Sequence, residues 1–569
     1  MKKVLSLFCI GLMAVSLVGC GSSDKKSSTL TVGAESLTGT FSPIYYSSSY
    51  DGYAVDLVYN KLGEYDVNNK LQPSLAESWT VSDDAKSVTF KLKKGIKFSD
   101  GTDFNAKDVE FTFKVVSDPS YDGRYAGTTQ YLSGYANYNN LENKEEPEFP
   151  GIKVVDDYTI TFTTDEARND SLTAYAASFA IISKEQFKDY KYKNTKAVKD
   201  LIKEPIGTGP YVMKKWDAGS GASFTKNENY SAKQLGEGYE IENVIIKPTK
   251  MTTEYQELES GNIDILAGSI EPKKIGPATN NKDLKLNSYP RGGAGYITFN
   301  AGAGVTQDKL VRQALTYAFD RQSFVDSYYE CPKCKGLDGA QIGYVPTLYN
   351  NPLSEMGPAI RGEEKIEGLN TYEYNIETSK QLLDQAGWTV GADGFRYKNG
   401  EKLSIKILSM ADHDILANLV PMWQKAWGTE LGADVQVATV DFNTILDKIY
   451  YDKNANEWTV FFLATSYTSD GMTDIYTTFN SRYAKDGSDN YARLKNPEVD
   501  ALLDKGLTTL DKEEAVNVWK EIAVKLNDEA TVVPVYGNTY FDIYNKRVKN
   551  LKTNALYSWP KALKDATLE

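Results

Sequence analysis

Histidine is almost absent from this chain, because its 569 residues include only His413. Ser-His-Asp and Cys-His mechanisms both need an imidazole poised as the base. His413 stands in "MADHDILAN", the polar opening of an expected helix, where a capping or surface role is typical. The Asp-Thr-Gly signature of aspartic proteases is missing, and the Asp-Gly pairs of "SDGTD" and "TSDGM" are turn signals. These absences argue against a catalytic function.

Long apolar runs are also missing beyond the N-terminus. No stretch after Cys20 has 18 or more consecutive apolar residues, so none is expected to span a membrane. The run from Val4 to Val18 is shorter than the ~20 residues that a spanning helix needs. Lys2 and Lys3 precede this run and small residues end it, a pattern that indicates a secretory signal peptide.

The apolar run ends at "LVGC", and the polar tract "GSSDKKSST" begins at once. A buried helical cysteine is the alternative, but this polar neighbourhood suits burial poorly. The junction resembles the lipobox of bacterial lipoproteins, which are cut before a cysteine that then carries acyl chains. Several chains anchor stably, at roughly 0.8 kcal/mol per buried methylene. The resemblance implies a signal peptide over 1–19, a lipidated tether over 20–29 with Cys20 as attachment site, and a location on the extracytoplasmic face of the membrane, at the cell surface or in the periplasm.

Cysteine is scarce as well, with four residues in all. Cys9 leaves with the signal peptide and Cys20 is the anchor, so Cys331 and Cys334 of "ECPKCKG" remain. A close pair in an exported protein is typical of a disulfide. Half a zinc site is the alternative, but the chain has no second CxxC and only one histidine. We therefore expect a disulfide, and no metal or cofactor.

A basic block with interleaved aromatic residues is missing too, and the formal net charge is −13 with a pI of about 5.0. Nucleic acid is therefore not an expected partner. With 41% hydrophobic and 25% charged residues, the chain is an ordinary globular mix, long enough for more than one core. Tyrosine is abundant, at 39 residues. The rings suit either a wet binding cleft or a tyrosine-rich surface and strand composition.

Local patterns predict mixed secondary structure. Val88, Phe90 and Leu92 alternate with polar residues, which predicts a strand with one wet face. Asn105 and Asp108 have the spacing of a capping box at the start of a helix. Strands and helices in this mixture favour an α/β or α+β fold.

Two later segments also read as helices. In 308–319 an apolar stripe is expected on one face, with three polar residues outside it. The stripe consists of Val311, Ala314, Leu315 and Ala318, and the polar residues are Lys309, Arg312 and Gln313. In 375–386, Asn375 can cap the start of a helix and Gly387 can close its end.

A series of motifs along the chain resembles, in content and order, the extracytoplasmic solute-binding proteins of the peptide/oligopeptide/nickel class, which serve ABC importers. The series covers nearly all of the chain after the signal peptide. It consists of the region "LQPSLAESWTVSDDAKSVTFKLKKGIKFSDGTDFNAKDVEFTF", then "GTGPY", "ELESGNIDIL", "YITFNAGAGVTQDKLVRQALTYAFDRQSFV", "NIETSKQLLDQAGW", "GADGFRYKNGEKLSIKI", "KNPEVDALLD" and "EATVVPVY".

This resemblance implies a fold of two lobes that close on a ligand by a hinge motion. Lobe 1 would use 30–290 and the C-terminal 531–569, and lobe 2 would be inserted between them as 291–530. The two crossings between the lobes are expected near Ser288–Gly295 and Thr531–Tyr536.

Peptide-binding members hold an extended peptide between the lobes, by backbone pairing of the kind seen in β-strand addition. Two segments correspond to this site, the early "GAESLTGTFSPIYY" and the late "FFLATSYTSDGMTDIY". The substrate-binding residues that the resemblance implies are Glu35, Ser36, Leu37, Asn300, Ala464, Thr465, Ser466, Tyr467 and Asp470.

The late segment departs from the family pattern at one position. Many peptide-binding members have an aspartate there, which meets the peptide ammonium. Ser466 stands at that position in this chain, with Asp470 four residues on and Asp474 beyond it. The acid that meets the ammonium is therefore Asp470, Asp474 or neither.

The expected function is a lipid-anchored, monomeric binding subunit that delivers oligopeptides to the permease of an ABC importer. A surface lipoprotein for adhesion or signalling on the same fold is one alternative, because fold does not fix function. A non-peptide solute such as an oligosaccharide is another. Nickel is not supported, because the chain has a single histidine and no cysteine cluster.

Replacing Cys20 with Ser tests the lipid anchor. We expect the Cys20→Ser variant to leave the membrane fraction, because its acyl chains cannot be attached. Cell fractionation with immunoblotting measures this, and the wild-type chain is the control. A variant that sediments with membranes as wild type does would show that the anchor lies elsewhere.

Overall fold

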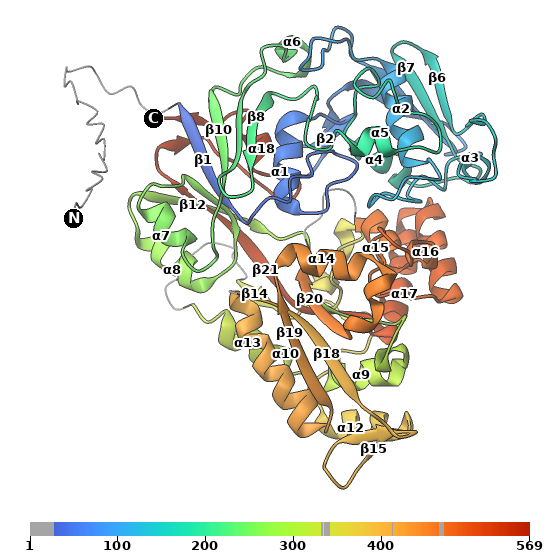
Figure 1. The fold of residues 1–569 in the computed structure, drawn as a ribbon, viewed down its shortest axis with the longest axis vertical. Coiled ribbons are helices and arrows are strands. Elements are labelled where there is room, and N and C mark those ends of the chain that lie inside the picture. The colour runs from blue at the N-terminus through green and yellow to red at the C-terminus, as the bar shows by residue number, and fades with distance from the viewer. Residues whose placement is uncertain (1–27, 332–333, 335–341, 412, 466–470) are drawn as a thin grey trace, which may run out of the picture.

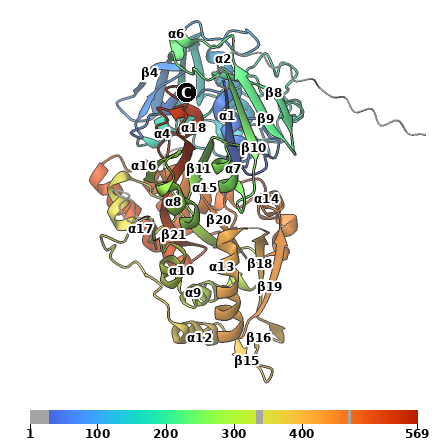
Figure 2. The same cartoon turned by 90° about the vertical axis from the view of Figure 1, so that its left-hand side faces the viewer.

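The structure is a computed structural model, and it describes residues 28–331, 334, 342–411, 413–465 and 471–569. These residues form two lobes, one above the other in Figure 1, and the turned view in Figure 2 shows the same division. Lobe 1 surrounds a core that begins at Leu30 and includes C-terminal residues up to Ala566. Lobe 2 holds two cores, built from residues between Ile270 and Tyr536. The expected two-lobed α/β fold is confirmed.

One large sheet runs through both lobes, and its strand β21 (Val532–Asn545) is shared between them. On the lobe 2 side the strands follow in the order β13 (Gly295–Phe299), β20 (Val460–Ala464), β18 (Ser404–Met410) and β19 (Asp434–Val440). On the lobe 1 side they are β11 (Ile265–Ser269), β1 (Thr29–Ala34), β10 (Asn243–Pro248), β9 (Gly221–Lys226) and β8 (Tyr211–Asp217). Two further strands pair with β21, namely β12 (Leu284–Pro290) and β14 (Gly343–Tyr344).

The pairing of β21 locates the crossings between the lobes. The first crossing lies between the end of β12 at Pro290 and the start of β13 at Gly295, inside the expected range. The second lies further along the chain than Thr531–Tyr536, because residues up to Tyr536 still pair with β13 of lobe 2. Pairing with the lobe 1 strands β11 and β12 extends from position 539 onward. No loop marks this boundary, since β21 continues straight through it.

Smaller sheets and helices complete the lobes. Lobe 1 has a sheet of β4 (Ala76–Val81), β5 (Ser87–Leu92), β7 (Thr159–Thr163) and β6 (Ile152–Asp156), and the pairs β2 (Gly63–Tyr65) with β3 (Leu71–Pro73) and β22 (Val548–Lys549) with β23 (Thr567–Leu568). Its helices are α1 (Ser49–Val58), α2 (Ala106–Val116), α3 (Tyr135–Tyr138), α4 (Ser171–Ser178), α5 (Lys196–Lys199), α6 (Ala232–Leu235), α7 (Glu254–Glu259), α8 (Pro272–Asn280) and α18 (Trp559–Ala562).

Lobe 2 carries the sheet of β15 (Thr389–Val390), β16 (Arg396–Lys398) and β17 (Glu401–Lys402). Its helices are α9 (Lys309–Tyr317), α10 (Arg321–Tyr328), α11 (Gly357–Ile360), α12 (Ile376–Gln385), α13 (Asp414–Trp423), α14 (Phe442–Tyr450), α15 (Gly471–Phe479), α16 (Pro497–Thr508) and α17 (Lys512–Glu529). Across the described ranges, none of these helices has the length and apolar character that crossing a bilayer requires.

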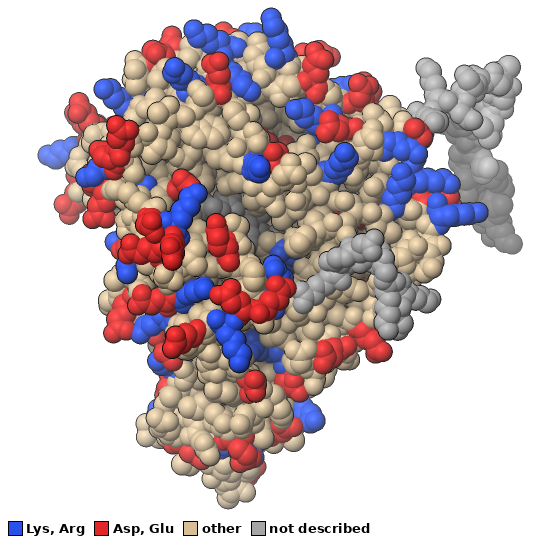
Figure 3. Space-filling view, turned by 180° about the vertical axis from the view of Figure 1, so that it is seen from behind, with Lys and Arg blue, Asp and Glu red and all other residues tan. Residues whose placement is uncertain are grey.

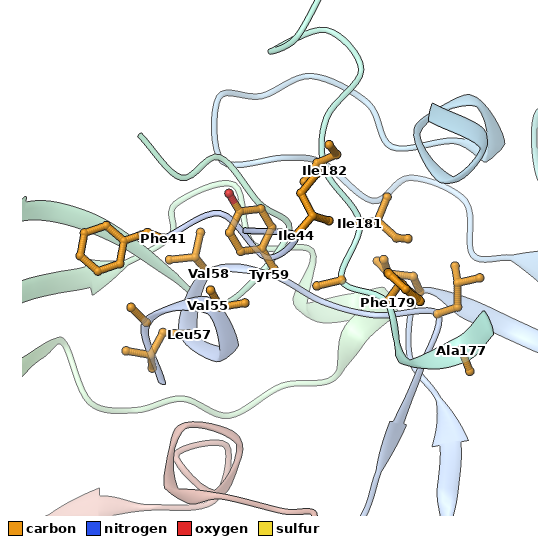
Figure 4. Close-up of a cluster of buried hydrophobic side chains, with 14 of the residues drawn as sticks. Phe41, Ile44, Val55, Leu57, Val58, Tyr59, Ala177, Phe179, Ile181 and Ile182 are labelled. Carbon is orange, nitrogen blue, oxygen red and sulfur yellow. The ribbon is translucent and has the colours of Figure 1, made fainter. Parts of the chain in front are cut away.

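The core of lobe 1 shows why "GTGPY" carries two glycines. Figure 4 shows α1 residues such as Val55 and Val58 in one apolar cluster with Phe41 and the 177–182 segment. A Cβ on Gly207 would lie 2.1 Å from the Val58 carbonyl oxygen, and one on Gly209 would lie 2.5 Å from the carbonyl carbon. Glycine therefore lets this turn approach the end of α1, where the Gly209 N–H donates to the Val58 carbonyl at 2.7 Å.

Most local predictions are confirmed. Val88 and Phe90 of β5 are buried, as the alternation predicted. Asn105 and Asp108 form the capping box of α2, and Asn375 caps α12. The apolar stripe of α9 is buried in the core of lobe 2. These elements follow from rules that act over a few residues, so the sequence was sufficient to predict them.

Arg312 of α9 is a correction, because it was expected outside the stripe and is only 2% exposed. Its guanidinium donates to the Glu529 carbonyl at 2.8 Å and to the Glu529 carboxylate at 3.0 Å. It also donates to the carbonyls of Thr306 and Gln307, at 2.9 and 3.1 Å. These partners satisfy the charge inside the protein and bind α9 to the end of α17.

The chain also forms a disulfide between Cys331 and Cys334, whose Cα atoms are 5.2 Å apart. Cys334 is 3% exposed and packs in a small core with lobe 1 residues that include Leu258, Leu284 and Phe541. The chain reaches this position directly after α10 of lobe 2. A short excursion from lobe 2 therefore ends in an apolar contact on lobe 1.

Replacing Arg312 with Met leaves the carboxylate oxygen Oε2 of Glu529 without its charged partner in the core. We expect the free energy of unfolding to fall by roughly 3–5 kcal/mol. Arg361→Met is the matched control, since Arg361 pairs with Glu363 on the surface and its loss should cost about 1 kcal/mol or less. Urea unfolding followed by tryptophan fluorescence measures both. Equal losses in the two variants would contradict the importance of the buried pair.

Candidate functional site

The early segment follows β1 at one edge of the large sheet. Because β1 pairs in parallel with β10 and β11, the C-terminal ends of three strands open at this edge, where open α/β sheets bind ligands. Glu35 is half-buried there, Ser36 is exposed, and Leu37 is buried in the core of lobe 1. Burial and the nearby Glu254 raise the pKa of Glu35, while Lys274 opposes them. Glu35 and Ser36 are thus not fully buried, whereas Leu37 is part of the core.

The late segment follows β20. Ala464 is exposed and Thr465 is half-buried at the end of that strand. The predicted residues Ser466, Tyr467 and Asp470 lie outside the described residues, so their roles stay predictions.

Arg291 fastens the late segment to the crossings between the lobes. It is 7% exposed, and its Nε donates to the Thr465 carbonyl at 2.7 Å. Its Nη1 donates to Asn538 Oδ1 at 3.3 Å, and its guanidinium lies 4.8 Å from the centre of the Tyr540 ring. Sequence reasoning missed this residue, although it stands in "YPRGGAG" inside the first expected crossing.

Tyr50 of α1 is influenced by Glu35 of the early segment and by Tyr540 of β21. Burial raises the pKa of Tyr50 well above its ordinary value, and nearby Glu35 and Tyr540 add to the effect. Tyr540 is also the ring on which Arg291 packs. Thr465 is thus held beside the crossing strands through Arg291.

Asn300 does not join them, which corrects its assignment as a substrate-binding residue. Its Oδ1 accepts the N–H groups of Gly302 and Ala303 at 3.0 Å, and its Nδ2 donates to the Ala455 carbonyl at 2.8 Å. It follows the end of β13 that lies opposite Gly295 and the crossing. The side chain is fully buried and holds a turn, so it is not available to a ligand.

Opposite charges face each other where the lobes meet. The Arg124 guanidinium of lobe 1 lies 5.1 Å from the ring centre of Tyr46 and 5.3 Å from that of Tyr125. No group among the described residues accepts a hydrogen bond from its side chain, and its Nε is buried. Burial opposes the change, but Tyr125, Tyr46 and Asp489 of lobe 2 together raise the pKa of this arginine above its ordinary value. Arg124 is therefore a cation with aromatic neighbours and with free donors.

Asp489 completes this cross-lobe pair. Its Oδ1 accepts the Tyr491 hydroxyl at 3.1 Å and lies 3.5 Å from the Tyr450 hydroxyl. Burial raises the pKa of Asp489, while Arg124 and the two phenols oppose the shift. No ion pair within 4.0 Å joins it to Arg124 in the described structure. Sequence reasoning missed both residues, since neither stands in a recognisable motif and only the packing of the lobes brings them together.

The lobes touch on both sides of the region just described. The rings of Tyr50 and Phe442 meet edge to face at 6.4 Å. Gln130 of lobe 1 donates to the Tyr483 hydroxyl at 3.1 Å, and that hydroxyl donates to the Gly127 carbonyl at 3.1 Å. Figure 3 shows the surface hollowed where the two lobes meet. The two lobes therefore contact each other at several points around their junction.

His413 lies near a further contact between the lobes and caps α13. Its Nδ1 accepts the Leu416 N–H at 3.3 Å, which requires a neutral ring. Burial lowers the pKa of His413 to about 4, although Glu271 and Asp414 oppose the shift. Asp414 itself pairs with Lys273 of α8 at 2.6 Å. The expected capping role is confirmed, and no catalytic arrangement surrounds the ring among the described residues.

The comparisons with known proteins agree with this architecture. Residues 70–490 match the family described as "Bacterial extracellular solute-binding proteins, family 5 Middle". The chain belongs to this family, as its series of motifs predicted. It is accordingly an extracytoplasmic solute-binding protein of the kind that serves ABC importers, and not an enzyme.

Relatives of different specificity cover nearly the whole chain. Heme-binding protein A of Haemophilus influenzae is 28% identical over 531 residues, which are 90% of this chain and 87% of that one. Oligopeptide-binding protein AppA of Bacillus subtilis is 26% identical over 551 residues, or 94% and 92% of the two chains. The solved structure of Bacillus subtilis AppA with a nonapeptide has a TM-score of 0.80 at 23% identity, covering 95% of this chain and 99% of that one.

The buried, neutral histidine predicts how stability depends on pH. The pKa of His413 is lower in the folded state than in the unfolded chain. As pH falls from about 6.5 toward 4, the unfolded chain therefore binds a proton at His413 before the folded protein does, and the free energy of unfolding decreases. His413→Asn keeps a capping side chain that does not titrate. We expect the melting temperature of wild type to fall more steeply than that of His413→Asn over this range. Parallel curves, or a single imidazole NMR signal that titrates near 6.5, would contradict this.

Proposed function

We propose that this protein is a lipid-anchored, monomeric subunit that captures extended oligopeptides between its lobes and delivers them to an ABC permease. Cys20 carries the anchor, and the polar tether keeps the lobes on the extracytoplasmic face of the membrane. The family and the oligopeptide-binding relative support the general assignment. Peptide as the ligand, lipid as the anchor, the monomeric state and delivery to the permease are the four parts that we add.

The facing charges of Arg124 and Asp489 are the observation that carries this proposal. Each is half-buried at the junction of the lobes, and no ion pair within 4.0 Å joins them. The amino terminus of a peptide offers the complementary groups, an ammonium for Asp489 and a first carbonyl oxygen for Arg124. Asp489 thus takes the role that the sequence left to Asp470, Asp474 or neither.

Backbone pairing would hold the rest of the peptide. The early segment continues from β1, and the late segment continues from β20 with Thr465 held by Arg291. Extended segments of this kind bind peptides by main-chain hydrogen bonds, which are the same for every sequence. The expected result is loose selection of side chains together with firm recognition of the amino terminus.

An oligosaccharide is the second candidate, because tyrosines 46, 50, 125, 450 and 491 gather around the junction. Tyrosine rings and hydroxyls suit sugars as well as peptides. A metal ion has less support, since the described residues include no group of three or more ligating side chains. Mass spectrometry of the ligand that copurifies with the native protein distinguishes these candidates. Sugar masses, with no peptide, would overturn the proposal.

Replacing Asp489 with Asn tests recognition of the amino terminus. We expect calorimetry to show that affinity for a copurified peptide falls by roughly ten- to a hundredfold, because a charged hydrogen bond contributes ~1.5–3 kcal/mol. Acetylating the peptide should weaken wild-type binding to a similar extent, and the two effects should not add. Asp486→Asn is the control, because this neighbouring acid lies on the surface. Unchanged affinity for Asp489→Asn would remove Asp489 from the site.

A further inference from the structure

A small cavity with a mostly apolar lining lies between the lobes, apart from the residues already assigned. Its lobe 1 wall contains Arg168, Ser171 and Tyr175, and its lobe 2 wall contains Tyr476 and Tyr483. The cavity volume is about 20 Å³. One water needs roughly 10–15 Å³, so the space fits one or two waters or a small polar group.

Arg168 brings a positive charge to this cavity without a partner for it. Its guanidinium lies 4.9 Å from the ring centre of Tyr131, and its Nε is buried. No side chain or carbonyl among the described residues accepts a hydrogen bond from it, and no described carboxylate lies within 4.0 Å. A buried donor without a partner costs free energy, which a ligand with acceptor atoms would recover.

Ser171 adds a second donor beside the first. The residue is 4% exposed, and its Oγ has no hydrogen-bond partner among the described residues. It stands three positions after Arg168, in the first turn of α4. Both side chains line the same cavity, so one group could satisfy both.

The Tyr476 hydroxyl in the lobe 2 wall does not accept hydrogen bonds from Arg168 or Ser171. The Tyr476 hydroxyl donates to Asp504 at 2.7 Å and accepts from Arg482 at 2.8 Å, so its hydrogen bonds are already made. The donors of the cavity that have no partner among the described residues are therefore the Nε of Arg168 and the hydroxyls of Ser171 and Tyr175, all on lobe 1. A carboxylate group fits them, because it is small, anionic and accepts hydrogen bonds at both oxygens.

We propose that Arg168 and Ser171 bind a carboxylate group of the captured ligand, at a subsite distinct from the Arg124–Asp489 pair. This proposal rests on the peptide-binding function proposed above. The carboxylate is either the C-terminus of the peptide or an acidic side chain within it. The chemistry of the subsite is the same for both sources.

A row of packed rings sets an upper limit on the separation of the two sites. It leads from Tyr125, beside Arg124, through Phe179 and Tyr175 to Tyr131, beside Arg168. Successive ring centres are 5.0, 4.9 and 5.3 Å apart. At most about four or five extended residues, at ~3.4 Å each, span the distance from the Tyr125 ring to the Tyr131 ring. A short peptide held at its amino terminus by Asp489 could therefore place a carboxylate at Arg168.

The subsite exists only when the lobes are closed, because Tyr476 and Tyr483 belong to lobe 2. Asn169, next to Arg168, donates to the carbonyls of Gly506 and Thr509 at 3.0 and 3.3 Å across the junction. A carboxylate that fixes Arg168 thus acts beside a contact that forms on closure. Ligands with this group should stabilise the closed form more than ligands without it.

Three synthetic series of oligoalanines of increasing length test the subsite on the ligand-free mature protein. The first has a free C-terminus, the second a C-terminal amide, and the third an amide with one internal glutamate. We expect wild type to bind the best acid of the first or third series roughly ten- to a hundredfold more tightly than its neutral counterpart. The series that binds more tightly than the neutral amides identifies whether the carboxylate is the C-terminus or an acidic side chain. Calorimetry measures each affinity.

Two variants assign the effect to the proposed residues. Arg168→Gln should abolish the preference for acids, whereas Arg361→Gln, a surface arginine paired with Glu363, should keep it. Ser171→Ala should weaken binding of acids severalfold without lowering the melting temperature of the ligand-free protein, because its hydroxyl has no described partner. That variant keeps the test valid even if Arg168→Gln folds poorly.

The outcomes separate the two proposals. If wild type binds the neutral amides as tightly as the acids, or if Ser171→Ala and a folded Arg168→Gln both keep the preference, the subsite is refuted while peptide binding stands. If wild type binds no peptide of any series, peptide capture fails and the subsite fails with it.

Discussion

The shared strand β21 is the constraint on which the two-lobed structure depends. Its first part pairs with β13 of lobe 2, and its later part pairs with β11 and β12 of lobe 1, without a break in the strand. Each lobe therefore completes its sheet with residues of the same strand. Asn538 and Tyr540, which position Arg291 and through it Thr465, stand where the strand passes between the lobes. The site is assembled on this strand, so its geometry follows the angle between the lobes.

The sequence predicted what short-range rules decide, and little beyond them. The capping box at Asn105 and the apolar alternation around Phe90 depend on neighbours a few residues away, and both formed as expected. Arg312 was placed on the wrong face, because its partner Glu529 comes from a distant helix that no local pattern could reveal. Asn300 shows the reverse case, since a polar residue within a family motif was used to hold a turn.

The candidate site was predicted only in its early and late segments. Arg124, Arg168 and Asp489 stand in no recognisable motif. The two arginines are singled out because their buried Nε atoms have no hydrogen-bond partner among the described residues, and Asp489 because Arg124 lies near it. The tyrosines occupy different environments in the folded chain. Tyr50 lies at the junction of the lobes, while Tyr138 and Tyr211 are packed inside lobe 1. Composition could not separate these uses, because it does not say which rings face the junction.

The contact of Cys334 with lobe 1 has a mechanical consequence. Two bodies joined only by two adjacent strands could both bend and twist about the join. The contact of Cys334 with Leu258 and Phe541 adds a third point of attachment beside those strands. Each further attachment beside the crossing strands removes directions in which one lobe can move against the other. The contact of Cys334 should therefore restrict the relative motion of the lobes, so that Arg124 and Asp489 return to a similar alignment each time the lobes close.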